Sequence, residues 1–344
     1  MVPLLVLAAL PGGCGGGSGS SLTPGRVAFT AIPNETDASG QQLFTVDADG
    51  TGLTRLTYTD GDVYPSWSPD GKQILFSRAR GPVVDDEIWI VGAAGENEHR
   101  LTFGSGADWS PDGEQVAFTR HVSDELNEVA LINADGSDEH SLVSNASFAA
   151  WSPDGDHILF ERGDFYGGSI GVVDADGSDL QPLTNSSYDG CPSWSPDGKE
   201  IAYSGGPKRQ LYVMKADGSD ARLVGRTNNS ENAFVLACAS WSPDGKRLLF
   251  TTFDDDQDSE LVAVVNTDGT NQRILSPLPP EDDWITHEEP VWSPDGQHIL
   301  YLDADAGFDG QLWIMNADGS ARRRFTTGPF TQPNGGPDWD QKRD

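Results

Sequence analysis

The sequence predicts an all-β fold, a seven-bladed β-propeller built from four-stranded antiparallel blades. The pentapeptide Trp-Ser-Pro-Asp-Gly occurs six times, with its tryptophan at positions 67, 109, 151, 194, 241 and 292. A second signature of the type Asn-Ala-Asp-Gly-Ser lies at 47–51, 133–137, 174–178, 215–219, 266–270 and 316–320, with a weak copy at 92–96. The spacing of the tryptophans runs from 42 residues (67 to 109) to 51 residues (241 to 292). Such a period indicates a propeller or a solenoid.

Both signatures are typical of hairpin turns. In Ser-Pro-Asp-Gly the proline presets φ for the second position of a type I turn, and the glycine supplies the left-handed residue that ends it. Six copies of one aspartate are not needed for catalysis, so we interpret these six as turn residues: Asp70, Asp112, Asp154, Asp197, Asp244 and Asp295. The Asp-Ala-Asp-Gly copies would offer calcium too few oxygen ligands, since the first aspartate is Lys215 in one repeat.

Short β-rich runs lie between the two turns of each unit. The second strand of a unit reads QILFSR at 73–78 or HILYLD at 298–303, and the third reads EIWIV at 87–91 or QLWIMN at 311–316. These runs are apolar at consecutive positions, which is typical of strands buried on both faces of a sheet. A tryptophan strand before them and a polar strand after them complete a unit of four, as in a propeller blade.

The two ends of the repeat region predict how the ring closes. Residues 26–30, 42–47 and 54–57 form three strands without a tryptophan strand before them, and 335–340, with Trp339, form a tryptophan strand with nothing after it. Together they complete one blade, which makes seven and leaves no free sheet edge.

The repeat resembles that of TolB-like β-propellers, a WD-like repeat family. The resemblance rests on PSWSPDGK at 192–199, on LWIMNADGS at 312–320 and on RRFT at 323–326, and it covers one propeller domain at 26–342. It implies a propeller without the α/β domain that precedes the propeller in TolB. Prolyl oligopeptidase-type enzymes share such propellers, but no G-x-S-x-G nucleophile elbow is found here.

Residues 1–25 resemble a bacterial lipoprotein signal followed by a Gly/Ser linker. Val2 to Leu10 is apolar but too short to span a bilayer, and Cys14 precedes the run GGGSGSS. We therefore expect export to the periplasm or the outer face of a bacterial membrane, with a lipid on Cys14 as the sole membrane contact. The alternative is an N-terminal tail without a targeting role.

The charge limits the class of partner. Against 54 acidic side chains stand 22 basic ones, a net charge of −32, which argues against nucleic acid as a ligand. The connections between second and third strands and between units vary in length and are acidic, so they form the face where binding is expected. That composition suits a basic protein segment or a cell-wall component, and we expect a monomer.

Residues three to five before each tryptophan are predicted to line the wide mouth of the channel. The candidate binding residues are Asp62, Tyr64, Tyr188, Asp189, His287 and Glu288, with Trp284 nearby. Of six histidines we place His287 alone at the mouth, so no metal site and no cofactor is predicted. Cys191 and Cys238 occupy the same position in adjacent blades and form a candidate disulfide.

Two functions follow from this pattern. The one we favour is a non-enzymatic module that binds a protein or an envelope component through its acidic loop face, with no catalytic residue assigned. The alternative is a carbohydrate-active enzyme, a polysaccharide lyase or glycoside hydrolase, with Asp62, Asp189 and Glu288 as funnel carboxylates. Carboxylates are abundant throughout the chain, so their presence alone leaves enzymatic activity open.

Overall fold

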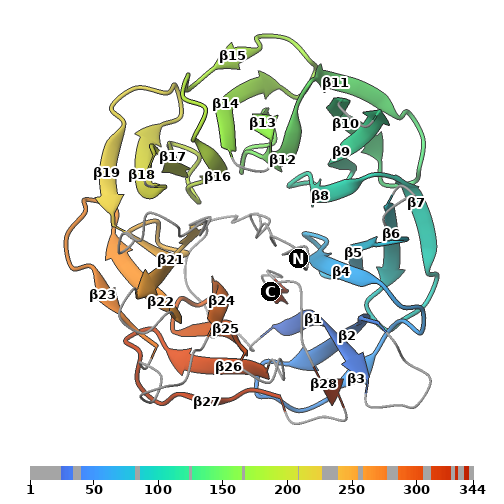
Figure 1. Ribbon diagram of the computed structural model, residues 1–344. Helices are drawn as coiled ribbons and strands as arrows, with labels where there is room; N and C mark the ends of the chain where they lie inside the picture. The colour runs from blue at the N-terminus through green and yellow to red at the C-terminus, as the bar shows by residue number, and fades with distance from the viewer. Residues whose placement is uncertain are drawn as a thin grey trace.

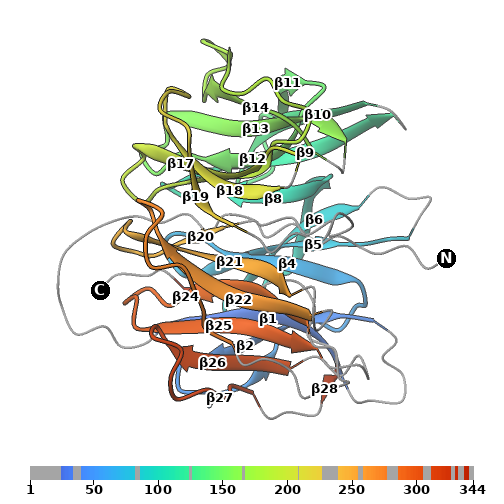
Figure 2. The same cartoon turned by 60° about the vertical axis from the view of Figure 1, so that its left-hand side comes forward.

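The computed structural model has the predicted architecture, a closed ring of seven antiparallel blades (Figure 1). It describes residues 25–33, 40–81, 86–123, 126–164, 167–207, 209–226, 239–254, 259–276, 286–304, 311–326, 330–331 and 337–340. All regular structure in these residues is β. In the turned view of Figure 2 the strands of successive blades cross the thickness of the ring in the same general direction.

Each blade has its tryptophan strand innermost and a polar strand outermost. Blade 1 contains β1 (Arg26–Pro33), β2 (Gln42–Asp47) and β3 (Thr54–Arg55), with β28 (Phe330–Thr331) and β29 (Asp338–Trp339) paired to β1. Blades 2 and 3 contain β4 (Asp62–Trp67), β5 (Gln73–Arg78), β6 (Glu87–Gly92) and β7 (His99–Phe103), then β8 (Ser105–Trp109), β9 (Gln115–Ser123), β10 (Leu126–Asn133) and β11 (His140–Ser144). Blades 4 and 5 contain β12 (Ser147–Trp151), β13 (His157–Asp164), β14 (Gly167–Asp174) and β15 (Gln181–Pro182), then β16 (Gly190–Trp194), β17 (Glu200–Gly205), β18 (Gln210–Lys215) and β19 (Arg222–Gly225). Blades 6 and 7 contain β20 (Ser240–Trp241), β21 (Arg247–Asp254), β22 (Ser259–Asn266) and β23 (Arg273–Ile274), then β24 (Thr286–Trp292), β25 (His298–Ala304), β26 (Gln311–Asn316) and β27 (Arg323–Arg324).

The ends of the chain close the ring as the sequence predicts. β29 pairs antiparallel with β1, with Trp339 opposite Val27 and Asp338 opposite Ala28. Figure 1 shows the blue strands of blade 1 beside the red strands of blade 7. The closing strand thus supplies the inner tryptophan strand that the N-terminal segment lacks.

The hydrophobic core is a ring of seven clusters, each lying between two adjacent blades. One cluster joins Ala28 and Leu43 of blade 1 to Trp67 and Phe76 of blade 2, and another joins blades 7 and 1 around Trp339. Because each blade contributes both faces to this ring, the middle strands are apolar at consecutive positions.

The Ser-Pro-Asp-Gly segments form the predicted turns. In blade 2 the Gly71 N–H donates to the Ser68 carbonyl over 2.8 Å, and the Asp70 carboxylate accepts from the Ser68 hydroxyl (2.8 Å) and the Lys72 N–H (3.1 Å). The hydrogen bond from the Lys72 side chain is the largest cause that lowers the pKa of Asp70. These bonds give the repeated aspartate a structural role in the turn.

The glycine of the second turn allows close packing between blades, most tightly where the ring closes. Gly50 of blade 1 has φ +89°, and a Cβ at this position would lie 2.8 Å from the Phe325 carbonyl oxygen of blade 7. Gly113 of blade 3 has a similar φ of +74°, but a Cβ there would meet its nearest neighbour, Pro69, at an ordinary 3.5 Å. The two turns therefore differ in packing and share the same backbone requirement.

We expect Gly50→Ala to lower the free energy of unfolding more than Gly113→Ala does. Gly113→Ala introduces the left-handed strain of a non-glycine residue, about 1 kcal/mol or slightly more. Gly50→Ala adds displacement of a backbone carbonyl at the closure, for a total of roughly 2–3 kcal/mol. Urea unfolding followed by tryptophan fluorescence measures both, and equal losses would contradict the packing argument.

Candidate functional site

Each inner strand that the structure describes over its full length carries a β-bulge three residues before its tryptophan. In β4 the register shifts between Val63 and Ser66, and β8, β12, β16 and β24 shift at the equivalent place. The residue at the bulge has a positive φ in every case: Tyr64 (55°), Gly106 (61°), Phe148 (57°), Cys191 (51°) and Glu289 (51°). We call these five the bulge positions.

The bulge positions combine a constant backbone with a variable side chain. A left-handed conformation costs a non-glycine residue on the order of 1–3 kcal/mol, and four of the five accept that cost. Bulges re-aim side chains and are common beside functional sites. Because the flanking repeat is nearly constant while these side chains are aromatic, sulfur-bearing, acidic or absent, the bulge positions form the candidate site.

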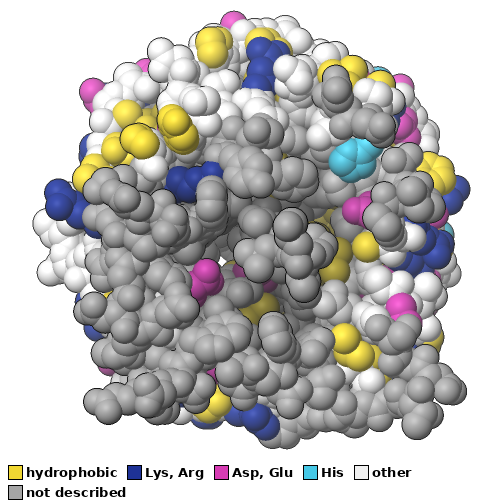
Figure 3. All heavy atoms as spheres, in the orientation of Figure 1, with side chains coloured by type: hydrophobic (Ala, Val, Ile, Leu, Met, Phe, Trp, Pro, Cys, Tyr) yellow, Lys and Arg dark blue, Asp and Glu magenta, His cyan; other side chains and the backbone are white. Residues whose placement is uncertain are grey.

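Two of the bulge positions, Tyr64 and Glu289, carry a phenol and a carboxylate. Burial raises the pKa of the half-buried Tyr64 phenol well above its usual value, and the negative charges of Glu289 and Asp86 raise it further. Glu289 is 7% exposed. Blades 2 and 7 thus place a phenol and two carboxylates within electrostatic reach of one another, and Figure 3 shows acidic side chains beside the centre of the face it views.

Asp62 lies buried inside the ring and not at the channel mouth, where its distance from Trp67 predicts it. Its carboxylate is fully buried and accepts from Arg78 Nε over 2.6 Å and from an Arg78 terminal nitrogen over 3.2 Å. The Thr57 hydroxyl donates to the same carboxylate, and Arg78 also pairs with Glu98 at 2.8 Å. Burial raises the pKa of Asp62 despite these bonds. Its observed role is an internal ion pair.

Asp189 is also buried and joins two blades. Its main chain exchanges hydrogen bonds of 2.8 and 3.0 Å with Gly168 of blade 4, and its carboxylate accepts from the Gly206 N–H over 3.2 Å. Its neighbour Tyr188 is 50% exposed. Asp62 and Asp189 lie in blades 2 and 5 and bond to separate partners, so the structure does not bring these two together as a catalytic pair.

The other predicted site residues are described in part or lie outside the described residues. The main chains of His287 and Glu288 belong to β24, but their side chains are outside the description, as are Trp284, Cys14 and Cys238. Cys191 is disulfide-bonded. Its pairing with Cys238 stays a prediction, since Cys238 lies outside the described part of the chain.

Sequence reasoning missed three carboxyl groups, of which Glu161 and Asp108 are buried and Asp338 is half-buried. Glu161 accepts from the Cys191 N–H, and burial raises the pKa of this carboxyl to about 7. Asp108 and Asp338 directly precede the tryptophans of β8 and β29. The repeats contain a sequence signal for Asp108 and Asp338. The other blades carry Ser, Ala or Val directly before the tryptophan, so a charged residue at this position is an exception.

The described residues contain no cluster of metal-binding side chains and no helix that could span a membrane. No group of three or more His, Cys, Asp or Glu side chains among them could hold a metal ion. They also contain no helix with the length and apolarity needed to cross a membrane.

The repeats match the model of the TolB beta propeller domain over residues 25–187 and 144–341. The chain belongs to the TolB β-propeller family. In this TolB-type propeller the matched residues reach from the start of β1 to beyond β29, so the family assignment covers the whole described ring.

Solved structures share this fold at low sequence identity. TolB from Acinetobacter baumannii is 21% identical with a TM-score of 0.54, over 72% of this chain and 62% of that one. A putative TolB from Agrobacterium tumefaciens is 19% identical with a TM-score of 0.54, over 86% of this chain and 99% of that one. An oligogalacturonate lyase in complex with manganese is 16% identical with a TM-score of 0.60, over 88% and 86%. At these identities the likeness concerns the fold alone, and this propeller spans less than two thirds of the Acinetobacter protein.

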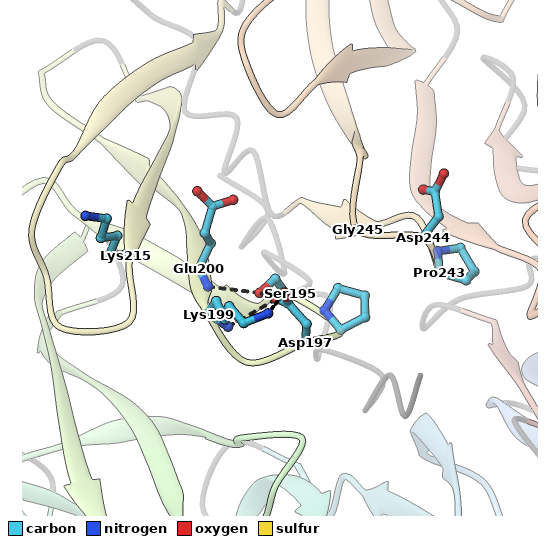
Figure 4. Close-up of a pocket in the computed structure, with 9 residues that line it drawn as sticks. Ser195, Asp197, Lys199, Glu200, Lys215, Pro243, Asp244 and Gly245 are labelled. Carbon is cyan, nitrogen blue, oxygen red and sulfur yellow. Dashed lines mark hydrogen bonds and ion pairs between the residues drawn. The ribbon is translucent and has the colours of Figure 1, made fainter. Parts of the chain in front are cut away.

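The face of the ring that carries the Ser-Pro-Asp-Gly turns, which we call the turn face, has a hollow of about 510 Å³ between blades 5 and 6 (Figure 4). Its two lysines are paired: Lys199 with Asp197 at 2.8 Å, and Lys215 with Asp220 at 2.5 Å. Asp197 also accepts from the Ser195 hydroxyl over 2.9 Å. Since these bonds belong to the repeated turns, we place the candidate site at the bulge positions and not in this hollow.

Proposed function

We propose that this TolB-type propeller is an exported binding protein that acts without catalysis. It binds a basic segment of a protein or envelope partner at the channel mouth formed by the bulge positions. The observation that carries the proposal is the bulge in the five inner strands described over their full length, where one backbone geometry presents a different residue in each strand. Such a device suits recognition, because the scaffold stays fixed while the contacts vary.

The chemistry of the bulge positions favours a slender cationic group. Glu289 is 7% exposed, so a long, narrow side chain reaches it more readily than a globular surface does. Arginine and lysine have this shape, and Tyr64 adds an aromatic ring. The net charge of −32 attracts a basic partner from a distance.

Export and anchoring rest on the N-terminal sequence. Residues 1–25 would act as a signal and linker, and Cys14 would carry a lipid that holds the propeller at the membrane. The propeller itself, at 26–342, would then face the periplasm or the outside of the cell.

The test uses the full chain, a labelled oligo-arginine peptide and two single-charge variants. We expect Glu289→Gln to weaken peptide binding roughly tenfold or more, because a desolvated charge pair is lost. Glu114→Gln, the same change at an exposed position on the turn face, should have little effect. Binding to the wild type should weaken from low to high salt.

Fluorescence anisotropy at two salt concentrations measures these affinities. Equal affinity of the two variants would remove Glu289 from the site, and wild-type affinity that ignores salt would count against a cationic ligand. An envelope extract passed over wild-type and Glu289→Gln protein then asks whether a natural partner follows the same pattern.

A further inference from the structure

Near the central axis, four interfaces between adjacent blades are joined by a hydrogen bond from a tryptophan ring. The indole N–H donates to the carbonyl of the residue before the preceding blade's tryptophan. These bonds are Trp109 to Ser66 (3.2 Å), Trp194 to Ala150 (3.3 Å), Trp241 to Ser193 (3.2 Å) and Trp292 to Ser240 (3.3 Å). The residue before the tryptophan is uncharged in each of these preceding blades.

Two interfaces are joined by an aspartate carboxylate. Asp338 of the closing strand accepts from the Trp67 main-chain N–H over 2.7 Å, and Asp108 accepts from the Trp151 main-chain N–H over 2.9 Å. The indole nitrogens of Trp67 and Trp151 have no hydrogen-bond partner among the described residues, as is also true of Trp339. At these two interfaces a carboxylate therefore replaces the carbonyl as the acceptor between blades.

Asp108 lies on β8 and Asp338 on β29, the inner strands that flank β4, and both strands contact β4. Asp108 is 5% exposed, and Asp338 is half-buried. Burial raises the pKa of Asp108 to about 8, with a further contribution from the charge of Asp338. Burial likewise raises the pKa of Asp338 to about 7, with a further contribution from Asp340.

The charged groups on the strands packed against Asp338 do not neutralise it. On β1, the Arg26 guanidinium lies over the Trp67 ring, 5.0 Å from its centroid, and donates to the Ala93 carbonyl. On β4, the Asp62 carboxylate is bonded to Arg78, and Tyr64 is a neutral phenol. The nearby charge that acts on Asp338 is that of Asp340, which is repulsive.

The strands around Asp108 likewise offer no free cation among the described residues. On β9, Arg120 pairs with Glu128 and Glu139. On β5, Arg78 pairs with Asp62 and Glu98, and on β6 the Glu87 carboxylate pairs with two arginines. His121, at the far end of β9, bonds to Ser105 and Asn127, and β12 carries no charged residue.

We propose that closure of this propeller is proton-dependent: protonated Asp108 and Asp338 hold the blades together, and loss of their protons as the pH rises through neutrality loosens the closing strand. A proton removes the repulsion between the two carboxylates and the cost of burying their charges. In the protonated carboxyl group, the C=O oxygen still accepts the hydrogen bond from the main-chain N–H of Trp67 or Trp151. The ring is therefore tightest in a mildly acidic compartment.

The sign of the pH dependence follows from the raised pKa values. The folded state holds protons that the unfolded chain, with an ordinary aspartate pKa near 4, has already released. The stability that these two protons contribute is therefore fully present below that value, and this contribution is lost as pH rises toward 7 and 8. Each carboxyl can change the unfolding equilibrium constant up to about tenfold per pH unit within that window.

The experiment compares urea unfolding of the full chain at pH 6 and pH 8. We expect the wild-type unfolding constant to rise at least tenfold, and the double variant Asp108→Asn/Asp338→Asn to lose most of that rise, since the asparagine oxygen still accepts from tryptophan. Asp112→Asn, a turn aspartate at an exposed position, should keep the wild-type dependence. A double variant with the full wild-type dependence would overturn the proposal.

A second measurement needs no variant. We measure amide hydrogen-exchange rates of the wild type at pH 6 and pH 8 and correct them for the intrinsic effect of pH. The corrected rates should rise more in peptides covering β1 and β29 than in peptides covering β17 and β18. Equal changes in both regions would also overturn the proposal, even if the double variant failed to fold.

Discussion

Replacing Arg78 with methionine is expected to lower the free energy of unfolding by about 3–5 kcal/mol, because it leaves a buried carboxylate without its counterion. The Arg78 side chain is 2% exposed and the Asp62 carboxylate is fully buried. The guanidinium also lies over the Trp89 ring, 4.4 Å from the centroid, and bonds to Glu98. Methionine fills much of the volume and supplies none of these bonds.

The repeat provides a matched control for this substitution. Arg120 occupies the same position in blade 3 and pairs with Glu128 and Glu139, but its side chain is 31% exposed. Arg120→Met should therefore cost about 1 kcal/mol or less, as is usual for solvent-exposed ion pairs. Urea unfolding of both variants measures the difference, and similar losses would show that burial of the pair is not what matters.

A double variant separates the loss of the ion pair from the loss of packing. Asp62→Leu combined with Arg78→Met replaces the pair with apolar side chains, so most of the stability lost in Arg78→Met should return. The single variant should also be less destabilised at pH 5 than at pH 8, because the unpaired Asp62 can be neutralised by a proton. A double variant as unstable as the single one would contradict this account.

Replacing Trp339 with alanine is expected to cost about 3–5 kcal/mol and to open the ring. Trp339 is 3% exposed, and its ring lies 6.3 Å from that of Phe325, centroid to centroid. The closing strand pairs with β1 through two residues, Asp338 and Trp339. With so few pairs, the tryptophan supplies most of the apolar contact that keeps this strand in place.

Trp151 is the matched control, since it is 6% exposed at the same repeat position and lies mid-chain in blade 4. Trp151→Ala should lose a similar free energy of unfolding while the ring stays closed. Hydrogen exchange of β1 and the radius of gyration from solution scattering distinguish the two. If β1 stays protected in Trp339→Ala, then closure does not depend on this tryptophan.

The distance of a residue from its tryptophan does not by itself show which face of the inner strand it occupies. Asp62 and Tyr64 lie five and three residues before Trp67, yet Asp62 is fully buried inside the blade and Tyr64 occupies the bulge. One extra residue at a bulge changes which side chains share a face, because alternation along a strand has a period of two. The Trp-Ser-Pro-Asp-Gly sequence does not indicate that the strand before it contains an extra residue at a bulge.

The sequence by itself determined the number of blades, the position of every tight turn and the way the ends meet. These features are local or repeated: a proline and a glycine fix a turn within five residues, and seven tryptophans count seven inner strands. What the tertiary structure decided is which acids are buried and what they contact. Asp338 meets Trp67 across 271 positions of sequence, and Asp62 meets Arg78 inside a wall built by two blades. Burial and pairing of a charge depend on neighbours that the ring brings together, so composition alone could not separate these carboxylates from those on the surface.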